Sequence, residues 1–141
     1  MIDVREDQAA GLRRLFRRAP PTVVAMYATG RHRAHNALRA AHGIAGQAER
    51  VIVIDEAHGE ASLAHQLALP EGPDLLSVVD GRAHLGVLVQ AVPGLAGRVP
   101  AAAAALALPL LDENRRDALL AAIHQLQRRA GFMLIHAASA G

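Results

Sequence analysis

One short run limits what this chain can fold into more than any other feature. Val51-Ile52-Val53-Ile54 places four β-branched side chains in a row, and Asp55 follows them directly. β-branched residues favour strands, and a strand without polar alternation is typical of one that is buried on both faces. The run therefore predicts a central strand of a parallel sheet that helices cover on either side.

The segments around this run alternate between strand-like and helix-like patterns. The predicted strands are residues 22–28, 51–55, 95–100 and 132–135. The predicted helices are residues 34–48, residues 61–68, short segments within 75–91, and a helix that Asp112 caps and Gly131 ends. Alternating elements of this kind predict an α/β fold with a mostly parallel sheet and helices on both faces.

An arginine-rich segment precedes the first predicted strand. Ala9, Leu12, Leu15 and Phe16 share one face of a short amphipathic helix, with five arginines around it, and Pro20-Pro21 end it. A helix of this length is marginal in water by itself, so we expect it to order only on a partner. The chain then divides into a docking helix with its linker, residues 1–21, and one α/β domain, residues 22–141.

Composition excludes several classes of function. All fifteen basic residues are arginine, so the chain has no lysine to serve in a phosphate-binding loop. It has no cysteine, which excludes disulfides and thiolate metal sites. Aromatic residues make up only 2% of the chain, which disfavours base stacking and hence nucleic-acid binding. No signal peptide or spanning apolar run is evident, so we expect a cytoplasmic protein without stable membrane insertion.

The N-terminal motif and the body together resemble a known family. Asp7-Gln8-Ala9, followed by Leu12-Arg13 and an α/β body, is similar to FlhG (FleN or YlxH), a MinD/ParA-type regulator of flagellar number. The resemblance implies a three-layer P-loop-like fold over residues 22–141. It reaches only about halfway through a usual member, so the sequence is either a fragment or a chain without the C-terminal half and its membrane-targeting helix.

In that family the N-terminal segment activates FlhF, a GTPase of the signal-recognition type. The resemblance implies that Gln8 approaches the catalytic site of the GTPase and that Asp7 helps to fix it. It also implies that Arg13 pairs with acidic groups, while Leu12, Leu15 and Phe16 anchor the helix in an apolar groove. The implied activating residues are Asp7, Gln8, Ala9, Leu12 and Arg13, and the implied docking residues are Leu15 and Phe16.

The body departs from the family at every position that handles nucleotide. Gly30 is the only glycine in the loop after the first strand, and Arg31 and Arg33 stand where lysines are found. Ala34 replaces the magnesium-binding threonine, Ala57 the catalytic aspartate and His136 the Walker B aspartate. The degenerate nucleotide site comprises Gly30, Arg31, Arg33, Asp55, Ala57 and His136. Since phosphoryl transfer depends on positioning and electrostatics, we expect a pseudo-ATPase without a cofactor.

The sequence thus favours a non-catalytic regulator of flagellar biosynthesis, with an FlhF-like GTPase as partner. Further flagellar partners and recruitment to the cell pole stay open. The alternative is a nucleotide- or metal-binding, enzyme-like domain, because four histidines follow strand ends and could face one crevice. They are His32, His35, His58 and His136. A third interpretation has the arginine-rich segment bind membranes or nucleic acid with strong salt dependence, and in the plainest one that segment has no special role.

Overall fold

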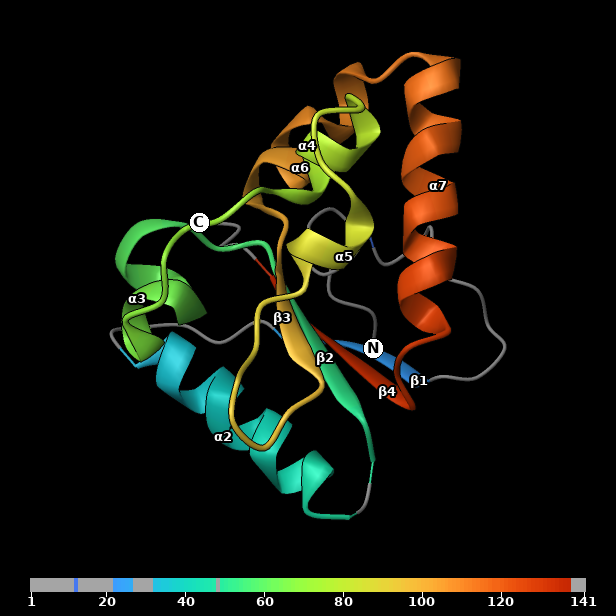
Figure 1. Cartoon of the computed structure of the whole chain (residues 1–141). Helices are drawn as coiled ribbons and strands as arrows, with labels where there is room; N and C mark the ends of the chain where they lie inside the picture. Colours follow the sequence, from blue (N-terminus) through green and yellow to red (C-terminus); the bar gives the residue numbers. More distant parts are fainter. Residues whose placement is uncertain (1–11, 13–21, 27–31, 48, 138–141) are drawn as a thin grey trace, which may run out of the picture.

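The computed structural model describes residue 12 and residues 22–26, 32–47 and 49–137. Its centre is a four-stranded, all-parallel sheet in the order β1-β4-β2-β3 (Figure 1). The strands are β1 (Thr22–Met26), β2 (Val51–Asp55), β3 (Gly97–Pro100) and β4 (Phe132–His136). Since β2 lies between β4 and β3, the predicted central strand is confirmed.

The helices form a layer on each face of this sheet (Figure 1). One layer holds α2 and α3, and the other holds α4 to α7. The helical elements are α2 (Arg33–Ala45), η2 (Gly59–Ala61), α3 (Leu63–Leu67), α4 (Leu75–Val79), α5 (Leu85–Leu88), α6 (Ala102–Ala107), η3 (Leu108–Leu110) and α7 (Glu113–Gln127). The expected three-layer α/β architecture is therefore present.

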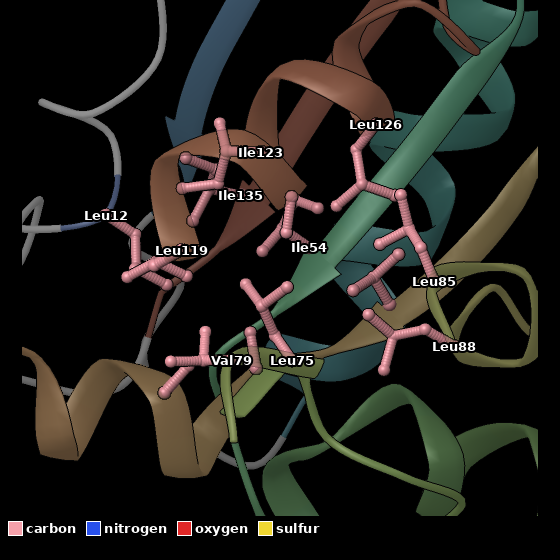
Figure 2. Packing of buried hydrophobic residues seen from close by; sticks show 14 of the residues in the cluster. Leu12, Ile54, Leu75, Val79, Leu85, Leu88, Leu119, Ile123, Leu126 and Ile135 are labelled. Atoms are coloured by element: carbon pink, nitrogen blue, oxygen red, sulfur yellow. The ribbon is translucent and has the colours of Figure 1, made fainter. Parts of the chain in front are cut away.

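The two faces of β2 show why its sequence has no polar alternation. Val51 and Val53 pack in the smaller apolar cluster, against the alanine-rich side of α2. Ile52 and Ile54 belong to the larger cluster, with the leucine and isoleucine side chains of α7 (Figure 2). All four are at most 1% exposed, so each face of the strand contributes to a separate half of the core.

Three helical boundaries differ from the sequence prediction. The segment predicted as one helix over 61–68 is split into η2 and α3, because Ser62 has an extended backbone and caps α3 by accepting from the His65 amide. Ala68, expected to point inward, is exposed and ends α3 in the left-handed conformation at φ 53°. Residues 102–110, for which no helix was predicted, form α6 and η3, since a run of alanine and leucine carries no periodic signal. Helix α7 ends at Gln127, before the predicted stop at Gly131.

An ion-paired cluster connects α4 with α7 at the surface. Asp80, the C-cap of α4, accepts hydrogen bonds from the guanidinium groups of Arg115 on α7 and of Arg82. The hydrogen bond from Arg115 holds the pKa of the Asp80 carboxyl below its usual value, with Arg82 adding to the effect. Asp80 therefore keeps its negative charge to a lower pH than an unpaired aspartate does, although partial exposure to solvent limits the contribution of this ion pair to stability.

Candidate functional site

The carboxyl ends of the four strands meet in one row across the sheet. Met26, His136, Asp55 and Pro100 are register partners from β1, β4, β2 and β3. In open α/β sheets, ligands bind beyond this edge. The structure thus places Asp55 and His136 side by side at this edge.

Asp55 is fully buried, and both of its carboxylate oxygens are engaged within the protein. Oδ1 accepts the amide N–H of Ala57 at 3.2 Å, and Oδ2 accepts the amide N–H of Leu63 at 2.8 Å. Oδ2 also accepts from Nε of Arg98 at 2.8 Å, in an ion pair with almost no exposure of either side chain. Asp55 therefore holds the start of α3 and strand β3 in place, and it is not free to bind a metal.

Arg98 connects Asp55 with Gln90 and, through Gln90, with Pro70. Its Nη1 donates to the side-chain oxygen of Gln90, whose Nε2 donates to the carbonyl of Pro70 at 2.8 Å. Two backbone hydrogen bonds between Gln90 and Arg98, at 2.8 and 2.9 Å, fix the same pair. A buried charge of this kind persists only when it is paired and hydrogen-bonded, and this network satisfies that condition.

A cavity of about 210 Å³ opens at the ends of β2 and β3. Ala57, His58, Glu71, Asp74 and Arg98 contribute to its wall. Asp74 caps two helices at once, since its side chain accepts from Leu76 of α4 at 2.8 Å and from the first turn of α6 at 3.0 and 3.1 Å. The carboxylates of Asp55 and Asp74 thus both accept hydrogen bonds from within the protein. His58 and Glu71 are exposed at the rim of the cavity.

His136 has no exposure to solvent, so it does not face an open crevice. Its Nε2 lies 2.9 Å from the carbonyl oxygen of Ala61, which assigns the proton of a neutral ring to Nε2. Its Nδ1 is buried and finds no hydrogen-bond partner among the described residues. An imidazole carries no negative charge, so His136 lacks the charge with which a carboxylate holds magnesium.

The four histidines do not converge on a metal site. His32 and His35 are exposed at the start of α2, and His58 is exposed after β2, whereas His136 is buried. Within the part of the chain that the structure describes, no three His, Cys, Asp or Glu side chains are placed to hold a metal ion. The expectation of one shared crevice fails because His136 is buried beside the carbonyl of Ala61, whereas His32, His35 and His58 are exposed.

The other residues of the degenerate site are only partly described. Arg33 is half-buried as the first residue of α2, and His32 before it makes no side-chain cap. Ala57 is buried at 6% exposure and lines the cavity. Gly30 and Arg31 lie outside the described residues, so their contribution stays a prediction.

Leu12 is the one described residue of the segment 1–21, and the expectation that this segment orders only on a partner stays a prediction. Leu12 is 1% exposed and belongs to the larger apolar cluster of the body (Figure 2). Burying a leucine side chain is favourable by about 1.5–3 kcal/mol. The rest of the predicted activating and docking set lies outside the described residues: Asp7, Gln8, Ala9, Arg13, Leu15 and Phe16.

Sequence reasoning missed Arg98, Gln90 and Asp74, which organise this edge of the sheet. A signal for Arg98 was present, because it is the one charged residue in the predicted strand 95–100. A charge in a buried strand requires an opposite charge nearby, and Asp55 ends the neighbouring strand. No comparable signal indicated that Asp74 accepts hydrogen bonds from two helices, since α6 lies far from Asp74 in the sequence.

The comparisons with known proteins support the fold. No protein-family model matches the chain, and the comparison with curated proteins gives no match. Cobyrinic acid a,c-diamide synthase from Mycobacterium smegmatis, with bound ATP analogue and magnesium, superposes with a TM-score of 0.60 at 18% identity, over 81% of this chain and 50% of that chain. The same synthase with bound ADP and magnesium gives a TM-score of 0.60 at 15% identity, over 81% and 49% of the two chains.

These matches show that the described residues share the α/β fold of this synthase. The chain spans about half the length of the solved structures that it matches. At this low identity the likeness concerns the fold alone, and neither of the two structures is an FlhG. Among the described residues, no helix has the length and apolar character needed to cross a membrane.

Proposed function

We propose that this protein is a non-catalytic regulator that binds and activates an FlhF-like GTPase through its N-terminal motif, residues 7–13. One observation supports the non-catalytic part. Asp55, the acidic side chain at the end of the central strand, is fully buried and engaged by Arg98 and by two backbone amides. In open α/β sheets, ligands bind beyond the carboxyl ends of the strands. Here the carboxylate at the end of the central strand is already occupied by hydrogen bonds within the protein. The activating part rests on the resemblance of the motif to FlhG.

The body then acts as a scaffold that does not require its own nucleotide cycle. The chemistry of phosphoryl transfer needs a lysine, a magnesium ligand and a group that orients water. The chain has no lysine, and His136 and Ala57 occupy the positions of the two aspartates. Further flagellar partners, and recruitment to the cell pole by the GTPase, belong to the same proposal.

The purified chain is expected to show no ATP turnover above buffer, because each of these positioning groups is missing. Phosphate release in the presence of Mg²⁺ measures it, with a heat-denatured sample as control. Hydrolysis that persists through further purification, and disappears in Arg31→Ala or Arg33→Ala, would contradict the proposal.

A peptide of residues 1–20 is expected to raise the GTP hydrolysis rate of the cognate FlhF-like protein without the body. Gln8→Ala should remove most of this stimulation and leave binding largely intact, since the side chain would act on the geometry at the reacting phosphate. Phe16→Ala should instead weaken binding, because it removes apolar contact area. Single-turnover GTP hydrolysis and titration calorimetry separate the two effects.

Arg18→Ala serves as the matched control, because it removes a long side chain of the same segment outside the motif. It should leave the maximal stimulation unchanged. The activator assignment fails if the peptide binds without stimulating, or if the Gln8→Ala peptide stimulates as well as the original one.

A second candidate function, nucleotide binding without hydrolysis, has one observation in its favour. The two synthase structures of the same fold carry ATP-analogue or ADP with magnesium, and Arg33 begins α2 with no acidic residue in the first turn. Titration calorimetry with ATP, with and without Mg²⁺, tests it. Micromolar binding that is lost in Arg33→Ala would favour this candidate over a scaffold without ligand.

A further inference from the structure

The cavity at the carboxyl ends of β2 and β3 has a charge balance that the proposed function does not use. Its wall holds three carboxylates and one guanidinium group, those of Asp55, Glu71, Asp74 and Arg98. Asp55 and Arg98 neutralise each other in their buried ion pair, so Glu71 and Asp74 leave an excess of negative charge. A cleft lined mainly by one sign of charge concentrates ions of the opposite sign, and this cavity therefore favours a cation.

Arg98 adds a hydrogen-bond donor to the acidic wall. A guanidinium group carries N–H donors on every nitrogen, but among the described residues only Nε and Nη1 of Arg98 find an acceptor. Nη2 is not one of the atoms that are both sealed from solvent and without a partner, although the whole side chain is only 4% exposed. Since Arg98 borders the cavity, Nη2 offers its N–H groups to a molecule bound there. The matching group is a neutral oxygen, because a carboxylate would meet the negative charge of the wall.

The side chain of Gln90 holds the guanidinium group and the loop that carries Glu71 in a fixed relation. Its Oε1 accepts from Nη1 of Arg98, and its Nε2 donates to the carbonyl of Pro70 at 2.8 Å. Gly72 packs against the same amide, since a Cβ at this position would lie 2.6 Å from Nε2 of Gln90. The carboxylate of Glu71 has no hydrogen-bond or ion-pair partner among the described residues. It is therefore available to a ligand from a preorganised loop.

We propose that this cavity binds a small organic ammonium compound that also carries a neutral carbonyl oxygen, such as an amino amide. The ammonium group pairs with Glu71, and the carbonyl oxygen accepts from Nη2 of Arg98. The volume of about 210 Å³ suits a molecule smaller than the ligands of drug-sized pockets, which are about 300–1,000 Å³. A metal ion is disfavoured, because no three His, Cys, Asp or Glu side chains among the described residues are placed to hold one. The site uses no residue of the N-terminal motif, so it does not depend on the proposed function.

Valinamide is a suitable probe, because each of its two polar groups can be removed without changing the rest of the molecule. Isobutylamine lacks the carboxamide, and isovaleramide lacks the ammonium group. At about pH 6.5 the amine is protonated, since an α-amino group has a pKa of about 7.7–8.0. An NMR titration of the full chain should show saturable shifts of amides that border the cavity, those of Ala57, Ala102 and Ala103. The dissociation constant of valinamide should be at least about tenfold lower than that of either fragment.

Glu71→Gln removes one charge of the wall from an exposed side chain and leaves the ion pair of Arg98 intact. It should raise the dissociation constant of valinamide at least about tenfold and leave that of isovaleramide unchanged. Glu113→Gln is the matched control, because Glu113 is exposed on α7 and does not border the cavity. Ala103→Leu should also weaken binding, since the larger side chain takes up part of the cavity. Thermal unfolding shows whether each variant is folded.

Three results would overturn the proposal. The first is the absence of saturable binding of valinamide, or binding no tighter than that of isobutylamine. The second is equal affinity of Glu71→Gln and Glu113→Gln for valinamide, which decides the matter even if Ala103→Leu does not fold. The third is a set of shifted amides that lies away from the cavity.

Discussion

Replacing Arg98 with methionine is expected to lower the free energy of unfolding by about 3–5 kcal/mol, the range for removing one partner of a buried ion pair. Arg98 is 3% exposed and Asp55 is fully buried, so the carboxylate would be left in the core without its cation. The amides of Ala57 and Leu63 would offset only part of this loss. Urea unfolding followed by circular dichroism measures the change.

A double-mutant cycle with Asp55→Asn shows whether the two charges act as a unit. The double variant should lose clearly less free energy of unfolding than the two single variants lose together. The difference is a coupling energy of about 1–3 kcal/mol. Arg82→Met is the matched control, because the Arg82 side chain is 70% exposed and its ion pair lies at the surface. It should change stability by no more than about 0.5 kcal/mol. Additive losses at Asp55 and Arg98 would contradict the structural role of the pair.

Asp74→Ala is expected to destabilise the fold by about 2–3 kcal/mol, because it removes the caps of two helices that are each worth about 0.5–2 kcal/mol. The carboxylate of Asp74 accepts from the first turns of both α4 and α6. Its loss also disconnects two segments that are distant in sequence. Thermal unfolding and hydrogen exchange of the amides of Leu76 and Ala104 report the two helices separately.

Asp112→Ala is the matched control for this substitution. Asp112 is an exposed N-cap that serves α7 alone, through the Arg115 amide at 2.8 Å, so its loss should cost about 1 kcal/mol. If both substitutions destabilise the protein equally, or if exchange rises at only one of the two helices in Asp74→Ala, then Asp74 does not connect them.

The sequence predicted those parts of the fold that depend on local pattern. Val51–Ile54 was recognisable as a central strand because four β-branched residues without alternation suit only a position between two helical layers. Asp112 was recognisable as a cap from its place before a helix-spaced pattern. Residues 102–110 were not recognisable as helical, because a run of alanines presents apolar side chains on every side and so has no period.

The sequence predicted the chemistry of the site only where the presence or absence of a residue type is sufficient to exclude a reaction. The absence of lysine was visible at once. That Asp55 binds Arg98, and that His136 turns toward Ala61, depends on side chains brought together by strand order and by the path of η2. Leu12 is the clearest case, since its own segment predicts a partner-facing residue while its side chain lies in the larger apolar cluster.

The order of the sheet also has a consequence for how the protein is made. β4 lies between β1 and β2, although it follows both of them in the chain. During synthesis on the ribosome, β1 thus has no partner among the described strands until residues 132–136 have emerged. Pairings of such long sequence separation are slow to form, and a nascent chain would expose unpaired strand edges in the meantime. The insertion of β4 between β1 and β2 is accordingly expected to be a late step in the assembly of this sheet.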